Sequence, residues 1–137
     1  MRFSDFIGSN QVRRAQRDIA LAKSLIRTAE IDLKFVSSLE VNEISARKIL
    51  TNYYDILRSM LEAMAANDGY KVYSHEAFAC FLKEKSESIL AEKFDRFRRI
   101  INGINYYGKS ITVEEVKEHT REIAQMINDK CVKNKVS

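Results

Sequence analysis

Apolar residues recur every three or four positions along much of this chain, a spacing that is typical of amphipathic helices. The first such stretch predicts a helix from Ser9 or Asn10 to about Ser37. Its apolar stripe consists of Val12, Ala15, Ile19, Ala22, Ile26, Ala29, Leu33 and Val36. Basic residues lie off this stripe, at Arg13, Arg14, Arg17, Lys23 and Arg27. They form either a solvated polar face or the basic lining of a groove.

Local signals predict two further helices. Asn42 is a good N-cap for a second helix, whose apolar positions keep a helical period to about Ala66. Gly69 ends this helix as the residue that adopts a left-handed backbone conformation. Ser74 then opens a short third helix, since a serine side chain readily accepts a hydrogen bond from the first free amides.

The last two predicted helices meet at a polar and aromatic turn. The fourth begins near Ile89, is interrupted by Gly103 and ends by Gly108. Thr112 and Glu115 have the spacing of a capping box, which predicts the start of the last helix.

These elements predict an all-α fold: an antiparallel up-and-down four-helix bundle with an additional short helix, forming a single domain over residues 1–137. The absence of proline and the presence of only four glycines favour long helices over a loop-rich β protein. We expect residues 1–8 and 131–137 to be flexible.

Composition says more about the possible partners and location of the protein than about its activity. The net charge is +4 and the isoelectric point is near 9.1, which is compatible with nucleic acid or nucleotide partners but does not establish them. Cys80 and Cys131 lack the spacing of a metal site and are expected to be buried free thiols. No stretch is apolar enough for a signal peptide or a membrane span, so we expect a cytoplasmic protein with no membrane association.

The sequence offers few groups for chemistry. Phosphate-loop, zinc and serine-nucleophile motifs are absent, so we expect no metal and no cofactor. His75 follows Ser74 in the first turn of the short helix. It either hydrogen-bonds a neighbouring helix or serves as a general base or phosphate contact, which requires an arginine or carboxylate close by. His119 has only charged neighbours in sequence and is expected at the surface.

The strongest candidate site is the end of the fourth helix. Arg96 and Arg99 share a face, while Arg98 points elsewhere. Arg99, Asn102 and Tyr106 lie on one face if the helix continues through Gly103, so guanidinium and ring can together hold a phosphate and a base. Alternatively, a buried tyrosine hydroxyl clamps the turn. Tyr54 and Arg58 on the second helix can face the same region; core packing is the other use of that tyrosine.

The order of these features is similar to that of a known family. Tyr53 and Tyr54, then Gly69, then His75, then an arginine-rich helix ending at residues 105–109 (Asn-Tyr-Tyr-Gly-Lys) resembles the HEPN superfamily, in particular its small stand-alone prokaryotic members. The likeness covers about residues 10–130. It implies a four- to five-helix bundle, a homodimer, and a minimal nucleotidyltransferase partner in a toxin–antitoxin pair. Active members are metal-independent ribonucleases with an Arg-x(4–6)-His motif.

This chain departs from that motif, because no histidine follows Arg98 or Arg99 within six residues and Ile101 stands where an arginine is expected. We therefore expect a non-catalytic helical interaction module: a homodimer that acts with a minimal nucleotidyltransferase and binds nucleotide or RNA. The binding residues would be Arg99, Asn102, Asn105, Tyr106, Tyr54 and Arg58. The alternative is a metal-independent ribonuclease toxin, in which Arg99 holds the phosphate and His75 moves the proton.

Overall fold

The computed structural model describes residues 1–136, with side chains through Cys131, and this part of the chain is mostly helical. The elements run in the order η1 (Phe3–Phe6), β1 (Val12–Arg14), α1 (Ile19–Ser37), α2 (Ala46–Asn67), β2 (Tyr70–Val72), α3 (His75–Glu84), α4 (Ser88–Tyr106) and α5 (Val113–Val136). These residues therefore form five α-helices, one short 3-10 helix and a small antiparallel pair of strands. None of the described helices is long and apolar enough to cross a membrane.

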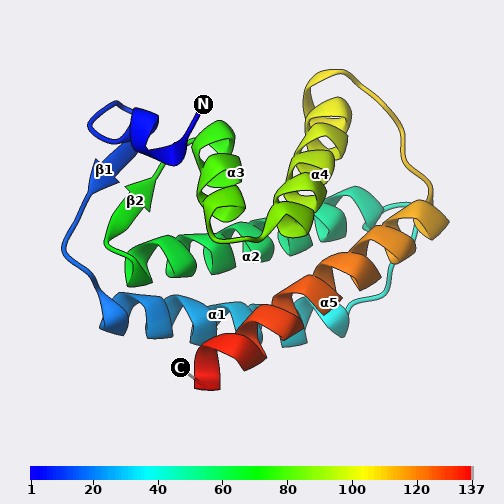
Figure 1. Ribbon diagram of the computed structural model, residues 1–137. Helices are drawn as coiled ribbons and strands as arrows, with labels where there is room; N and C mark the ends of the chain where they lie inside the picture. The colour runs from blue at the N-terminus through cyan, green and yellow to red at the C-terminus, as the bar shows by residue number, and fades with distance from the viewer. Residues whose placement is uncertain (137) are drawn as a thin grey trace.

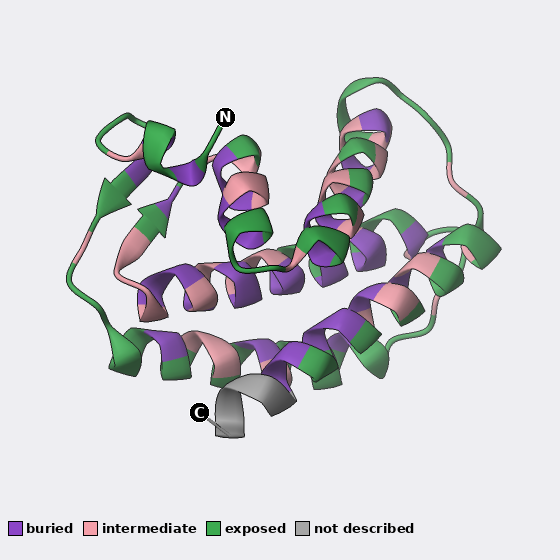
Figure 2. Cartoon of the chain, viewed as in Figure 1, coloured by how far each residue is buried: buried purple, intermediate pink, exposed green. Residues whose placement is uncertain are grey.

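Helix α2 is the centre of the molecule. It packs against α1, α5, α4 and β2, while α3 and α4 form a neighbouring pair (Figure 1). Figure 2 shows that the buried residues lie on the sides of the helices that face one another. The largest fully buried side chains come from β1 and from every α-helix except α1: Val12, Leu50, Leu57, Met60, Leu61, Phe78, Leu82, Phe94, Phe97, Val116, Ile123 and Ile127. One continuous core thus joins α2 to α3, α4 and α5.

The predicted start of the first helix is wrong. Val12–Arg14 form a strand that pairs antiparallel with Tyr70–Val72, and helix α1 begins only at Ile19. Asp18 caps that helix by accepting the Leu21 N–H at 2.9 Å. Val12 is fully buried as the spacing predicted, but on a strand. A single buried position such as Val12 fits both the alternating spacing of a strand and the helical spacing of apolar residues. Pairing with a distant strand can therefore decide the structure of a segment whose sequence also fits a helix.

Residues 1–8, which were expected to be flexible, make specific contacts with the rest of the fold. Phe3 and Phe6 are buried, and the Phe3 N–H donates to the Glu84 carboxylate at 2.6 Å. The Phe3 ring lies edge-on to Tyr70 and Phe81. Burial of two aromatic side chains therefore fixes the start of the chain against α3.

Three of the predicted helix ends are confirmed, whereas the predicted N-cap at Asn42 is wrong, because α2 begins at Ala46 with Ser45 as its N-cap. Gly69 has φ +87°, and Ser74 accepts the Ala77 N–H at 3.2 Å as the N-cap of α3. Thr112 and Glu115 form the predicted capping box, with both hydrogen bonds at 3.1 Å.

One expectation about the later helices needs correction. The predicted interruption at Gly103 is wrong, because α4 continues to Tyr106. The backbone of α5 is helical to Val136 and Cys131 is buried, whereas the side chains expected to be flexible after Cys131 lie outside the described residues.

Candidate functional site

Three helices bring one histidine, two arginines, a tyrosine and a carboxylate together. We call this set the His75 cluster; its members are Tyr54, Arg58, His75, Asp95 and Arg98. Tyr54 and Arg58 belong to α2, Asp95 and Arg98 belong to α4, and His75 is the first residue of α3. The convergence of these elements explains why residues far apart in sequence share one site.

The position of His75 is determined by the cap of its helix. Ser74 accepts the Ala77 N–H and donates its own hydroxyl to Gln11 Oε1 at 2.6 Å. The Tyr73 N–H also donates to the Gln11 carbonyl at 2.8 Å. The segment before β1 therefore holds the residue that precedes His75, and the first turn of α3 has little freedom to move.

The imidazole is further held by aromatic neighbours. Tyr54 Oη lies 3.1 Å from His75 Nδ1, a hydrogen bond that can serve either tautomer of the ring. Tyr54 stacks on Phe94 with ring centroids 5.4 Å apart, and the His75 ring is also 5.4 Å from Phe94. Burial raises the pKa of Tyr54, so its hydroxyl stays protonated at neutral pH. The site thus presents a half-buried imidazole in a fixed orientation.

Charged neighbours keep this imidazole neutral. Burial lowers the pKa of His75 from its ordinary value, and the positive charges of Arg98 and Arg58 lower it further, while Asp95 acts in the opposite direction. Arg98 donates from Nε and NH2 to Asp95 Oδ1 at 3.1 and 2.7 Å. These hydrogen bonds hold the pKa of Asp95 below its ordinary value. At pH 7 the cluster is therefore a neutral histidine beside two guanidinium groups and one carboxylate.

Sequence reasoning found part of this cluster. It named Tyr54, Arg58 and His75 as candidates, and the structure places these three together. It did not find Asp95 or Arg98. The available signal was helical spacing: Arg98 lies four residues after Phe94, on the same side of α4, and Phe94 is the ring on which Tyr54 stacks.

The other predicted residues lie outside the cluster. Arg99 NH2 is 3.2 Å from Asp95 Oδ2, and its side chain is 67% exposed. Asn102 is half-buried, whereas Asn105 and Tyr106 are exposed. Among the described residues, no hydrogen bond joins these last three side chains to the cluster. The alternative of a buried clamping tyrosine is wrong for Tyr106, because it is 77% exposed.

His119 is not a surface residue as predicted. It is half-buried, and its ring lies edge-on to Phe97 with centroids 5.7 Å apart. Its Nδ1 atom is buried without a hydrogen-bond partner in the described part of the chain. The charged residues on either side of it in sequence do not determine its burial, because His119 lies one turn after the fully buried Val116 and so faces α4.

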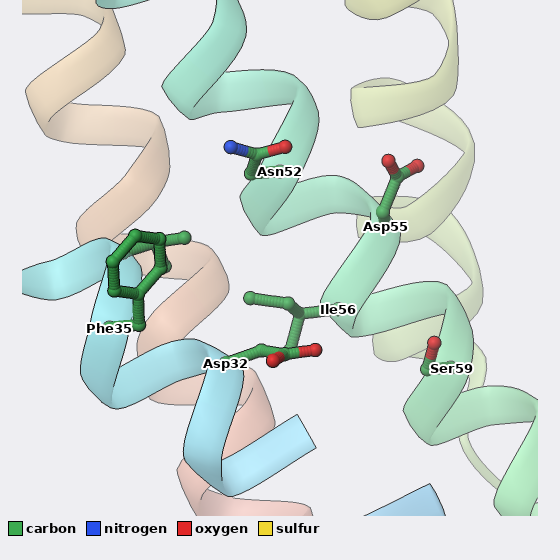
Figure 3. Close-up of a pocket in the computed structure, with 7 residues that line it drawn as sticks. Asp32, Phe35, Asn52, Asp55, Ile56 and Ser59 are labelled. Carbon is green, nitrogen blue, oxygen red and sulfur yellow. The ribbon is translucent and has the colours of Figure 1, made fainter. Parts of the chain in front are cut away.

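A groove between α1 and α2 has a different character from the His75 cluster. We call it the α1–α2 groove; it has a volume of about 260 Å³ and is lined by Asp32, Phe35, Val36, Asn52, Asp55, Ile56 and Ser59. In Figure 3, Asp32 and Phe35 lie on α1, and Asn52, Asp55, Ile56 and Ser59 lie on α2. Two carboxylates and no cationic side chain line the groove, and burial raises the pKa of Asp55. Such a surface repels a phosphate.

No cluster of three or more metal-ligating side chains occurs among the described residues. The chain matches no protein-family model, and neither a curated protein nor a solved structure is significantly similar to it. What the protein does has therefore to be argued from the geometry of its own residues.

Proposed function

We propose that the protein is a non-catalytic helical interaction module that binds the phosphate of a nucleotide or of single-stranded RNA at the His75 cluster. The observation that carries this proposal is an imidazole held by the Tyr54 hydroxyl, with the guanidinium groups of Arg58 and Arg98 near enough to lower its pKa. Arg58 lies 3.6 Å from the Glu62 carboxylate and Arg98 is held by Asp95, so both cations are positioned by carboxylates. Guanidinium groups bind phosphate through paired hydrogen bonds, and an imidazole N–H can add another.

The surroundings of the cluster favour a ligand with bases as well as phosphate. Tyr106 and Tyr107, at the end of the same helix that carries Arg98, are each 77% exposed. Exposed tyrosine rings stack on bases of any sequence, and exposed aromatic residues near a basic surface are common in proteins that bind single strands. The net charge of +4 also favours an anionic ligand.

A direct test is the titration of a fluorescently labelled single-stranded RNA, with fluorescence anisotropy as the readout, at low and at high salt. Arg98→Ala should weaken binding about tenfold, the cost of a lost hydrogen bond to a charged group. Arg27→Ala, a matched change at an exposed arginine of α1, should alter binding less than about twofold. Absence of RNA binding at low salt would overturn the proposal.

The second candidate is a metal-independent ribonuclease, and the location of His75 favours it. A general base must be neutral to accept a proton, and burial together with Arg98 lowers the pKa of His75. RNA incubated with the protein and a metal chelator distinguishes the two functions. Cleavage that disappears in both His75→Ala and Arg99→Ala would replace the binding proposal by the ribonuclease; intact RNA would support binding alone.

We also propose the finer architecture and partners that the HEPN resemblance implies: an up-and-down bundle that forms a homodimer and acts with a minimal nucleotidyltransferase. An exposed apolar surface on α1 supports the dimer, since Ile31 is 61% and Phe35 is 63% exposed. Light scattering should show a dimer at micromolar concentration and a monomer for Phe35→Glu. A monomeric wild-type protein would remove the dimer, and failure to co-purify with a nucleotidyltransferase encoded next to its gene would remove that partner.

A further inference from the structure

A basic pocket lies beside α4, lined by residues of that helix, of the following loop and of α5. We call it the Lys109 pocket; it has a volume of about 390 Å³, and its polar lining is Arg96, Arg99, Lys109, Ser110, Glu115 and His119. Figure 1 shows the loop that leads from the end of α4 to the start of α5. None of the residues that line this pocket belongs to the His75 cluster.

The charges in this pocket favour an anion. Three lining side chains are cationic and one, Glu115, is a carboxylate. The Glu115 carboxylate accepts the Thr112 N–H at 3.1 Å, so it is already used as part of the helix cap. Arg96 is paired with Glu122 at 2.7 Å, whereas no ion pair to Lys109 exists among the described side chains. Lys109 is therefore the cation most available to a ligand.

Two glycines explain how Lys109 reaches this position. A Cβ atom at Gly103 would lie 3.1 Å from Lys109 Cδ, so the aliphatic part of that lysine lies directly on the helix where no side chain projects. The Lys109 N–H donates to the Gly103 carbonyl at 3.0 Å, and Gly108 turns the chain with φ +66°. Gly103 in the middle of α4 thus has a structural role, the close approach of the loop.

A carboxylate links this pocket to the His75 cluster across α4. Asp95 accepts hydrogen bonds from Arg98 at one oxygen, and its other oxygen lies 3.2 Å from NH2 of Arg99. Arg98 belongs to the cluster and Arg99 lines the Lys109 pocket. Basic groups therefore continue from the His75 cluster to the Lys109 pocket along adjacent residues of α4. His119, which lines the pocket, has a buried Nδ1 atom with no hydrogen-bond partner among the described residues.

We propose that the Lys109 pocket is a second phosphate subsite, so that the ligand is a single-stranded polynucleotide that crosses α4 rather than a mononucleotide. This inference rests on the proposed function, because it takes the His75 cluster as the first subsite. A strand with one phosphate at the His75 cluster and one in the Lys109 pocket would pass over Arg98 and Arg99 and would leave its bases near the exposed ring of Tyr106.

The test compares a labelled oligouridine of about ten nucleotides, a length within the usual site size of single-strand binders, with uridine monophosphate as a competitor. Lys109→Ala should weaken the oligonucleotide about fivefold and lower its salt dependence by about one phosphate contact. It should leave competition by uridine monophosphate unchanged. Arg98→Ala should weaken both ligands, and Lys117→Ala, at an exposed lysine of α5, should change neither.

A second variant addresses the fold of the loop. Gly103→Ala should move the flexible Lys109 side chain only slightly, so it should weaken the oligonucleotide less than Lys109→Ala does, with an unchanged helical circular dichroism spectrum. An unchanged oligonucleotide affinity in Lys109→Ala, or an equal loss for both ligands, would overturn the second subsite while the proposed function stands. Absence of binding of both ligands to the wild-type protein would instead overturn the proposed function.

Discussion

Helix α2 contributes to two regions of opposite character. Towards α3 and α4 it presents Tyr54 and Arg58, which meet a histidine and a second arginine. Towards α1 it lines a groove with Asp55, together with Asp32 and the exposed ring of Phe35, and Asp55 also lies near Arg58. The groove is a defined depression, but its carboxylates disfavour the anion that the basic side of the helix attracts. The comparison teaches that the sign of the charge, more than the shape of a cavity, indicates which ligand a surface can bind.

The largest expected difference between the two regions concerns their phenylalanines. Phe94 supports Tyr54 and His75 and is 1% exposed, whereas Phe35 at the groove is 63% exposed. Phe94→Ala should lower the free energy of unfolding by about 3–5 kcal/mol, the usual cost of deleting a buried ring. Phe35→Ala should change it by less than about 0.5 kcal/mol in the monomer.

Urea denaturation at several protein concentrations measures both variants. Any effect of Phe35→Ala should increase with concentration, as expected of a residue in a dimer interface, and that of Phe94→Ala should not. Equal losses in the two variants would contradict the assignment of one ring to the core and the other to a surface.

The next effect concerns the hydrogen bond inside the cluster. Tyr54→Phe removes the hydroxyl that lies 3.1 Å from His75 Nδ1 and should lower the free energy of unfolding by about 1 kcal/mol. Tyr53→Phe is a matched control, because Tyr53 is also buried but has no hydroxyl hydrogen bond among the described residues. Denaturation of both variants under one condition is sufficient. A loss that is as large for Tyr53→Phe would remove the hydrogen bond as the explanation.

The two regions should respond to acid in opposite directions. His75 has a pKa below its unfolded value of 6.5, so the unfolded chain takes up a proton first and stability is lost as the pH falls below 6.5. Asp55 has a pKa above its unfolded value of 3.8, so the folded protein takes up a proton first and gains stability as the pH falls through the folded value.

Denaturation at about pH 7 and about pH 5.5 tests the histidine contribution. The loss of stability between these two values should be smaller in His75→Asn than in the wild-type protein. Asp55→Asn serves as the control from the groove and should keep the wild-type difference. A wild-type difference that persists in His75→Asn would assign the effect to another group.

The smallest effect is a change in the titration of His75 itself. Arg98→Ala should raise the pKa of His75, because it removes a nearby positive charge and leaves the carboxylate of Asp95 paired only with Arg99. Arg58→Ala should raise it less, since the influence of Arg58 is weaker. Nuclear magnetic resonance titration of the imidazole protons measures both, with Asp32→Asn in the groove as a variant that should have no effect. An unchanged or lower pKa in Arg98→Ala would contradict the proximity of the two side chains.

Local signals in the sequence predicted local structure well. Gly69, Ser74 and the Thr112–Glu115 pair ended or began helices as expected, because each acts through hydrogen bonds or backbone angles within a few residues. The pairing of β1 with β2 was not predictable in this way. It joins segments far apart in the chain, and the residues of β1 also fit a helical period.

The candidate site shows the same division. Helical spacing gives the directions of side chains relative to one another but not which direction faces a neighbouring helix. Arg98 was therefore seen to point away from Arg99, but not to point towards His75, and His119 was assigned to the surface although it packs on Phe97. Residue type was enough to name Tyr54, Arg58 and His75 as candidate site residues. Only the packing of α2, α3 and α4 shows that these three lie together.

Through the hydrogen bonds of Gln11, the opening segment of the chain stabilises the position of the His75 cluster. Gln11 holds both the Tyr73 amide and the Ser74 hydroxyl, the last two residues before the imidazole. If the β1–β2 pair separates, these anchors are released together, and the first turn of α3 loses its support without global unfolding. Amide hydrogens in that turn should then exchange with solvent at the rate at which β1 opens. Opening of β1, which is far from α3 in sequence, would in this way change how often His75 is correctly positioned for binding.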